Sequence, residues 1–493
     1  MKQLNFKSFL IAALFIFIII GLITNLVAGF TYPAWEDEAV ISDIAYNYYN
    51  FSTWKLDIIP NEGNAWIYGP IYFKIQNVFI KLFGFNPLSL RFTNGIATYL
   101  VIISIIYIIR KVVKNNIIII IVAIQLVIDS SFNRAITIGR MDMLATFFSL
   151  LGLVFALKYN DNKLKSIIIT SLFSSLAYLT TPRALFLLPA NFLIILFHII
   201  NELKTGYDFK KQLLNIFFAT CFFIIPILFW IQEVGGVSNY IEYINSSNHI
   251  SKHKGITLFR DKEDYVFMPL FLITTYFYLR NTAPSKLFIS LFVTLIFFTL
   301  FVKEVGPYRP MIMPYFYILL SIGCSSLLTR CEKSKLYSYL LKVTFIIFFS
   351  ISFSFFSYRA IDVLLINREC RNAHYLKNNL FRNIPNNKSI AIDYDYYFIF
   401  KNNNKSIQEF SYLKQVYYEK KILPDYLVLN QNTNNFLNKS KDKWYIWLKG
   451  NYNIEGRYNC EANEFSVFKS RRNYNGTILY VKKNFNNFKN TKF

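Results

Sequence analysis

Several signatures of common enzyme classes are missing from this sequence. It contains no P-loop and no G-x-S-x-G motif, so it lacks the usual sequence evidence for nucleotide hydrolysis and serine catalysis. Acidic residues are scarce, with 29 Asp and Glu against 53 Lys and Arg among 493 residues. The 5 cysteines, Cys221, Cys324, Cys331, Cys370 and Cys460, show no metal-like spacing. Only the last two lie in a hydrophilic region, where a bridge between them is an open alternative.

Long apolar runs are what the sequence has in abundance. Hydrophobic residues make up 54% of the chain, and the mean hydropathy is +0.32. Water-soluble domains rarely carry repeated blocks of this kind, so we predict a polytopic α-helical membrane protein with about eleven spans. The blocks lie approximately at residues 9–30, 91–109, 116–130, 142–157, 166–181, 184–200, 212–231, 266–279, 287–302, 311–329 and 338–357.

The loop charges predict an orientation for these spans. If the N-terminus is cytoplasmic, every inner loop is short and basic, as the positive-inside rule expects. An odd number of spans then places the tail outside, on the periplasmic face of the inner membrane in a Gram-negative cell. Contact with anionic membrane lipid accounts for the net charge of +24, and we expect no nucleic acid partner. The basic inner-loop residues are Arg110, Lys111, Lys114, Lys158, Lys163, Lys165, Lys204, Lys210, Lys211, Arg280, Lys286, Arg330, Lys333 and Lys335.

Hydrophilic segments divide the chain into two predicted domains. Residues 1–358 form the membrane domain, and residues 359–493 form a small α/β domain outside the membrane. In the membrane domain, outer loop 31–90 holds amphipathic stretches that favour helices in the interface, and outer loop 232–265 is polar. The tail alternates Asn-rich turns with short apolar runs at residues 389–393, 426–429, 444–448 and 478–481.

A short acidic run, Trp35-Glu36-Asp37-Glu38, follows the first apolar block. Carboxylates at the mouth of a membrane helix are costly unless they face water or a protein cavity. Adjacent residues diverge by about 100° on a helix, so Asp37 and Glu38 can face different partners. One interpretation is catalytic, with a carboxylate that meets a lipid-borne substrate at the membrane surface. The other is a helix cap, because acidic residues favour the first helical turn, and both can hold at once.

Basic residues on the outer face form a second candidate set. Arg140, Arg183 and Arg309 lie at the outer ends of predicted spans, and Lys74 lies in the first outer loop. Arginine binds phosphate through two parallel hydrogen bonds, so the set as a whole favours phosphate binding. For any single residue, snorkelling at the interface is the alternative. Asp142 begins an apolar run two residues after Arg140, either as an interfacial partner of that arginine or as part of the same site.

Two histidines, His249 and His253, are four residues apart, a spacing that suits metal ligands on one helix face. Glu242 is the one evident carboxylate that could join them, and histidines in a lysine-rich loop are usually solvated. We therefore expect no metal and no cofactor, with a divalent metal at this pair as the alternative.

Taken in order, these residues resemble the glycosyltransferase-C (GT-C) superfamily of integral-membrane sugar transferases. The sequence looks most like the branch of protein O-mannosyltransferases (the dolichyl-phosphate-mannose-protein mannosyltransferase family) and bacterial lipid A aminoarabinose transferases. The resemblance covers about residues 30–330. It is carried by W-E-D-E-A at 35–39, Y-G-P-I-Y-F-K-I-Q-N-V-F-I-K-L-F-G at 68–84, L-S-L-R-F at 88–92, G-R-M-D-M-L-A-T-F-F at 139–148, L-T-T-P-R-A-L-F-L-L-P-A at 179–190 and Y-R-P-M-I-M-P at 308–314.

The resemblance implies an inverting transfer of a sugar from a polyprenyl-phosphate donor to an envelope acceptor, which is lipid A, a glycan or a protein. Asp37 would be the general base or orient the acceptor, with Glu38 beside it and Asp142 lining the same cavity. The implied donor-phosphate residues are Lys74, Arg140, Arg183 and Arg309. Aminoarabinose transferases carry Lys-Pro-Pro where this chain reads Tyr68-Gly69-Pro70, and Lys74 is the substitute lysine that we expect.

The chemistry is consistent with the residues taken alone. A sugar phosphate carries its own leaving group, so transfer needs a base for the acceptor hydroxyl and cations for the phosphate. Two other functions stay open: an oligosaccharide ligase or polymerase with a pyrophosphate-linked donor, and a lipid or solute transporter. A transporter would carry ionisable residues at mid-membrane depth, and the predicted spans hold few of them.

Overall fold

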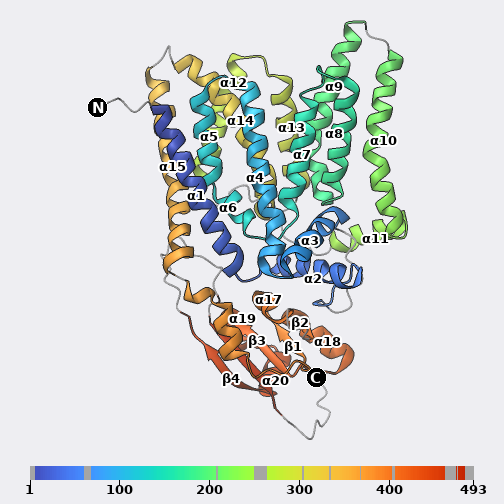
Figure 1. Cartoon of the computed structure of the whole chain (residues 1–493), viewed down its shortest axis with the longest axis vertical. Coiled ribbons are helices and arrows are strands. Elements are labelled where there is room, and N and C mark those ends of the chain that lie inside the picture. Colours follow the sequence, from blue (N-terminus) through green and yellow to red (C-terminus); the bar gives the residue numbers. More distant parts are fainter. Residues whose placement is uncertain are drawn as a thin grey trace.

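Upright helices form a bundle, and the C-terminal part of the chain (the C-terminal domain) covers one end of it (Figure 1). The computed structural model describes residues 6–59, 68–206, 209–248, 264–302, 305–331, 335–366, 368–401, 406–460, 474 and 476–483. Helix α1 (Phe6–Thr31) starts at the end of the bundle far from the C-terminal domain and ends close to that domain (Figure 1).

The bundle helices account for the apolar blocks of the sequence. Besides α1 they are α4 (Pro87–Val112), α5 (Asn116–Ile128), α7 (Asp142–Ala156), α8 (Lys163–Tyr178), α9 (Pro189–Lys204), α10 (Phe209–Glu233), α12 (Asp264–Asn281), α13 (Lys286–Phe301), α14 (Val305–Cys331) and α15 (Lys335–Ile361). Each predicted block falls on one of them, and the block at 184–200 begins in a short 3-10 helix, η1 (Pro182–Leu187), that leads into α9.

Six helices of the described residues are long and apolar enough to cross a membrane, one of them being η1 joined to α9. A bent pair, α5 with α6 (Ser130–Ile136), makes a seventh if it is one span. The chain is therefore a multi-pass membrane protein. The total of about eleven spans stays a prediction, because it counts shorter apolar helices such as α7 and α13.

The bend between α5 and α6 has a local cause. Asp129 lies at the break, where its side chain accepts the backbone N–H groups of Ser131 and Phe132 and so caps α6. Its other oxygen accepts a hydrogen bond from the Tyr317 hydroxyl on α14 at 2.7 Å. These partners satisfy a buried carboxylate inside the bundle, and the two helices meet at 51°.

Short helices lie across the end of the bundle that faces the C-terminal domain (Figure 1). They are α2 (Glu36–Phe51), α3 (Pro70–Phe83) and α11 (Val237–Asn248). In α3, Tyr72, Phe73, Gln76 and Ile80 are buried, which agrees with the predicted amphipathic helix. The predicted polar loop 232–265 contains α11, and residues 249–263 of this loop lie outside the described residues.

The C-terminal domain contains a five-stranded mixed sheet in the order β2-β1-β3-β5-β4. The strands are β1 (Ile390–Ile392), β2 (Ile407–Glu409), β3 (Tyr426–Asn430), β4 (Tyr452–Tyr458) and β5 (Thr477–Lys482). Strands β2, β1 and β3 are parallel, and β5 runs antiparallel to both β3 and β4. Three of the predicted apolar runs are strands of this sheet. The fourth, 444–448, lies in helix α20 (Lys443–Gly450), where Asp442 caps the first turn and Trp444 and Leu448 are buried.

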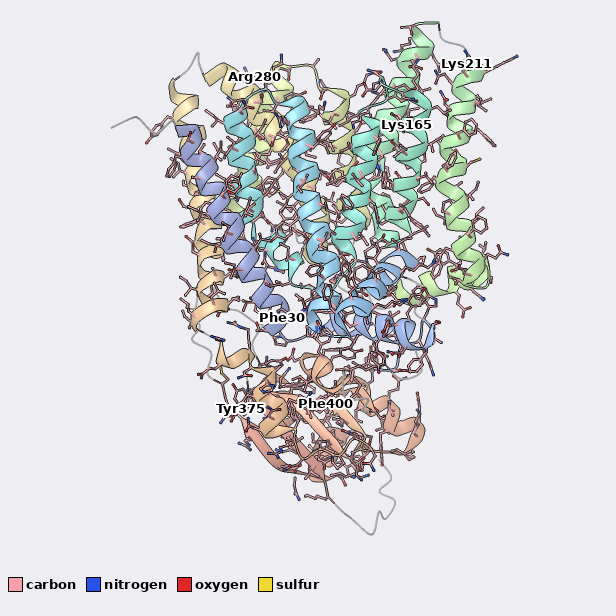
Figure 2. All side chains as sticks on the ribbon, in the orientation of Figure 1. Phe30, Lys165, Lys211, Arg280, Tyr375 and Phe400 are labelled. Carbon is pink, nitrogen blue, oxygen red and sulfur yellow. A yellow bond between two sulfur atoms is a disulfide. The ribbon has the colours of Figure 1, made fainter. Side chains whose placement is uncertain are left out.

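A disulfide joins Cys370 to Cys460, at the end of β4, so the bridge left open by the sequence is present. Basic residues mark the opposite end of the molecule. Figure 2 shows Lys165, Lys211 and Arg280 at the bundle end far from the C-terminal domain.

Candidate active site

Glu38 is buried and forms four hydrogen bonds with protein groups. Its side chain is 1% exposed and forms a two-point ion pair with Arg91 of α4, with Nε–Oε1 and Nη2–Oε2 distances of 2.6 and 2.8 Å. It also accepts the backbone N–H groups of Trp35 and Gly139 at 3.1 and 2.7 Å. The predicted helix cap is therefore real for Glu38. A carboxylate with these four bonds is a structural anchor for the start of α2.

Arg91 organises the chain that leads into α2. Besides Glu38, its guanidinium donates to backbone carbonyls in the last turn of α1, at Gly29, and between α1 and α2, at Tyr32 and Pro33. Gly139 packs closely against this cluster, because a Cβ atom there would lie 3.2 Å from Glu38 Oε1, closer than most Cβ contacts. Arg91 lies in the L-S-L-R-F run but is not among the site residues predicted from the sequence.

Asp37 has a different environment from its neighbour. Its side chain is 45% exposed, and its Oδ2 accepts a hydrogen bond from Nη1 of Arg140 at 2.7 Å. The Nε of Arg140 lies 2.7 Å from Asp142 Oδ2, in a pair that is buried. Arg140 thus bridges two carboxylates, and Asp37 is the one that solvent or a ligand can reach.

Arg140 keeps its positive charge despite its burial. Desolvation disfavours the charge on Arg140, but Asp142 and then Asp37 outweigh it and raise the pKa of the guanidinium. Asp142 is also in the first turn of α7, where the helix dipole favours a negative charge. The ion pair with Arg140 and the helix dipole together explain why Asp142 can begin an apolar helix.

Tyr308 connects two of the predicted phosphate-binding arginines. The guanidinium carbons of Arg140 and Arg183 lie 5.0 and 4.4 Å from the centre of its ring. Within the described residues, no carboxylate pairs with Arg183, so its charge is available to an anion. Arg309 follows Tyr308 in α14 and is buried. Helices η1 and α14 and the segment before α7 thus place Arg183, Tyr308 and Arg140 together.

Tyr68 is buried close to Arg183, Asp37 and Arg140, and their charges act on its hydroxyl. Burial raises the pKa of the Tyr68 phenol to about 12; Arg183 opposes the rise and Asp37 adds to it. The phenol therefore keeps its proton and can donate a hydrogen bond. Gly69 allows this segment to pass Leu179, because a Cβ atom at Gly69 would overlap the Leu179 carbonyl. Lys74 is on α3 with an exposed side chain, and no described carboxylate pairs with it.

A small cavity lies next to the acidic run. Trp35 and Glu38 line it from the membrane domain and Asp395 lines it from the C-terminal domain, with a volume of about 40 Å³. Burial raises the pKa of Asp395 to about 6, and a hydrogen bond from Asn430 opposes the rise. The C-terminal domain therefore contributes to the surroundings of the acidic run, which the sequence analysis did not predict.

The described residues show no group of three or more His, Cys, Asp or Glu that could hold a metal ion. His249 and His253, the pair with metal-like spacing, lie outside the described residues.

Comparisons with known proteins identify the fold. No protein-family model and no curated protein sequence matches this chain. ArnT from Cupriavidus metallidurans in the apo state matches with a TM-score of 0.58 and 12% identity over 94% of this chain and 97% of that chain. The same protein bound to undecaprenyl phosphate matches with a TM-score of 0.59 and 10% identity over 94% and 97%. The arabinofuranosyltransferase AftD from Mycobacteria matches with a TM-score of 0.51 and 9% identity over 97% of this chain and 40% of that chain.

ArnT and AftD are GT-C glycosyltransferases. The chain therefore has the fold of ArnT and AftD, in agreement with the fold that the resemblance of its sequence implies.

Proposed function

We propose that this protein is an inverting glycosyltransferase that moves a sugar from a polyprenyl-phosphate donor to an envelope acceptor. The observation that carries the proposal is the half-exposed carboxylate of Asp37, held by Arg140 beside the open guanidinium of Arg183. Transfer from a sugar phosphate needs a base for the acceptor hydroxyl and cations for the phosphate, and Asp37 and Arg183 would supply them. The fold shared with ArnT, which has been solved with undecaprenyl phosphate, adds support.

In the proposed step, the acceptor hydroxyl attacks the anomeric carbon of the sugar and gives its proton to Asp37. The bond from that carbon to the phosphate oxygen breaks, and polyprenyl phosphate leaves with the electron pair. Arg183, Arg309 and the Tyr68 hydroxyl would stabilise the charge that develops on the phosphate. Arg140 would hold Asp37 in place and contribute its charge to the same region.

We further propose that this chemistry takes place on the outer face of the cytoplasmic membrane. The acidic run and the C-terminal domain lie at one end of the bundle, and Lys165, Lys211 and Arg280 lie at the other (Figure 2). The positive-inside rule favours a cytoplasmic location for the basic end. The disulfide in the C-terminal domain supports the same orientation, since disulfides persist in oxidising compartments.

Mass spectrometry of envelope lipids and glycoproteins tests this function. Cells that lack the protein should lose one sugar-modified species, and the wild-type gene should restore it. A gene that encodes Asp37→Asn should not restore it. An unchanged envelope profile in the deletion strain would argue against the proposal.

The type of sugar donor distinguishes the proposed function from that of an oligosaccharide ligase or polymerase. Purified protein should transfer from a monophosphate-linked single sugar. Transfer from a pyrophosphate-linked oligosaccharide alone would identify an oligosaccharide ligase or polymerase instead.

A further inference from the structure

A buried carboxylate of α2 connects the membrane domain to the C-terminal domain. Asp43 is 0% exposed, and its Oδ2 accepts the backbone N–H groups of Asp57 and Ile58 at 2.6 and 2.9 Å. Its Oδ1 accepts hydrogen bonds from the Tyr397 hydroxyl at 3.0 Å and from Lys401 Nζ at 2.6 Å. The last two partners belong to α17 (Tyr397–Lys401) of the C-terminal domain.

Lys401 is enclosed by α2 and by the segment that follows it. Its side chain is 8% exposed, and its ammonium lies 4.6 Å from the ring centre of Tyr46 and 3.5 Å from Asp57. A lysine is rarely buried to this extent unless its charge is paired. The ion pair with Asp43 is therefore a specific docking contact between the domains. Nearby, the Glu409 backbone N–H of β2 donates to the Ile58 carbonyl at 3.0 Å.

The same short helix also reaches the start of α2. Phe398 lies against Arg91, with 5.7 Å between the guanidinium carbon and the ring centre. Arg91 in turn holds Glu38, the residue next to Asp37. Helix α17 thus supports α2 at two points, through Lys401 in the middle of α2 and through Phe398 and Arg91 at its beginning.

We propose that Lys401 is a positioning residue for the catalytic carboxylate, and that the C-terminal domain is required to align Asp37 for transfer. This inference rests on the proposed function. Rigid placement of α2 matters because a displacement of about 1 Å at a reacting group can reduce a rate by about 100-fold. The donor phosphate would be held by Arg183 and Arg309, which come from the bundle.

Lys401→Met removes the charge and keeps most of the side-chain volume. In full-length protein, we expect transfer per folded molecule to fall about tenfold or more, while the affinity for undecaprenyl phosphate changes less than about twofold. Lys401→Arg, which keeps a positive charge, should recover part of the rate. A residue with only a structural role would lower the yield or the melting temperature and leave the rate of the folded molecules unchanged.

Lys414→Met is a matched control. Lys414 pairs with Asp442 at the same 2.6 Å distance within the C-terminal domain, but the side chains are 36% and 39% exposed. This variant should transfer like wild type. If Lys401→Met does not fold, Tyr397→Phe removes one hydrogen bond to Asp43, and Phe398→Leu removes the ring from Arg91; each should lower transfer without changing lipid binding.

The outcomes separate the two proposals. Wild-type transfer by Lys401→Met, or by both aromatic variants where Lys401→Met does not fold, would overturn the positioning role if Asp37→Asn is inactive. Normal transfer by Asp37→Asn would overturn the proposed function itself.

Discussion

Two arginine–carboxylate clusters lie at the start of α2. In one the carboxylate is buried among protein groups, and in the other a carboxylate is exposed to solvent. In the closed cluster, Glu38 and Arg91 are each 1% exposed and bind each other and the backbone around them. In the open cluster, Arg140 pairs with Asp142 inside the protein and with Asp37 at the surface, where Asp37 is 45% exposed. The two adjacent carboxylates thus differ in exposure: the closed cluster holds the start of the helix, and we propose that the open one meets the substrate.

The closed cluster should have the largest effect on stability. Arg91→Met leaves Glu38 buried without its cation, and loss of one partner of a buried ion pair costs about 3–5 kcal/mol. We expect a large fall in folded yield and melting temperature in detergent. Asp37→Asn is the comparison, since a half-exposed carboxylate should change the melting temperature little. Similar melting temperatures for both variants would show that the closed cluster does not stabilise the fold more than the open one.

Arg183 and Arg309, which lie outside both clusters, should control donor binding. Arg183→Ala removes a cation that no described carboxylate neutralises, so affinity for undecaprenyl phosphate should fall about 10- to 100-fold. Arg309→Ala should weaken the same binding, although Arg309 is buried and this variant needs a stability measurement beside it. If both variants bind undecaprenyl phosphate like wild type, the donor phosphate does not bind at this site.

Asp393 differs from both clusters because it is a buried carboxyl that pairs with no described cation, and it accepts hydrogen bonds from neutral groups, namely the Asn430 N–H and the Thr433 hydroxyl. Burial raises its pKa to about 8 from an ordinary value of 3.8, with these bonds opposing the rise and Asp395 and Glu409 adding to it. The folded state keeps a proton that the unfolded chain has lost, so stability should fall as the pH rises from about 4 to about 8.

The expected slope from this group is at most about 1.4 kcal/mol per pH unit. Unfolding of the C-terminal domain in the full-length protein, followed at pH 6 and pH 7, measures it. Asp393→Asn should flatten the dependence, and an equal slope in the variant would assign it to another group.

Lys74 should have the smallest effect. It is exposed on α3, and no described carboxylate pairs with it. Lys74→Ala should change undecaprenyl phosphate binding by less than about twofold, whereas Tyr68→Phe, which removes a hydroxyl near Arg183, should change it more. The reverse order would restore Lys74 as the substitute for the lysine missing from Tyr68-Gly69-Pro70.

Much of the fold could be predicted from the sequence, because membrane helices and strands leave periodic or continuous apolar runs. The run at 444–448 lies in helix α20, and a short apolar run suits a strand and a buried helix equally well. Strands β2 and β4 fall on none of the predicted apolar runs. The acidic run and the arginines could be identified as a group because charged residues beside membrane helices are costly. The separate roles of Asp37 and Glu38 could not, because they depend on Arg91 and Gly139, which are distant in sequence. The docking of Lys401 on Asp43 likewise joins residues 358 positions apart.

The most direct test of this account is the rate of sugar transfer per folded molecule for Asp37→Asn, with the melting temperature and undecaprenyl phosphate binding measured on the same preparation. We predict a melting temperature close to wild type, donor binding that is retained, and a rate reduced by about 100- to 10,000-fold, the range for loss of a general base. A folded Asp37→Asn protein that transfers sugar at the wild-type rate would contradict the central claim that the open cluster is the catalytic site.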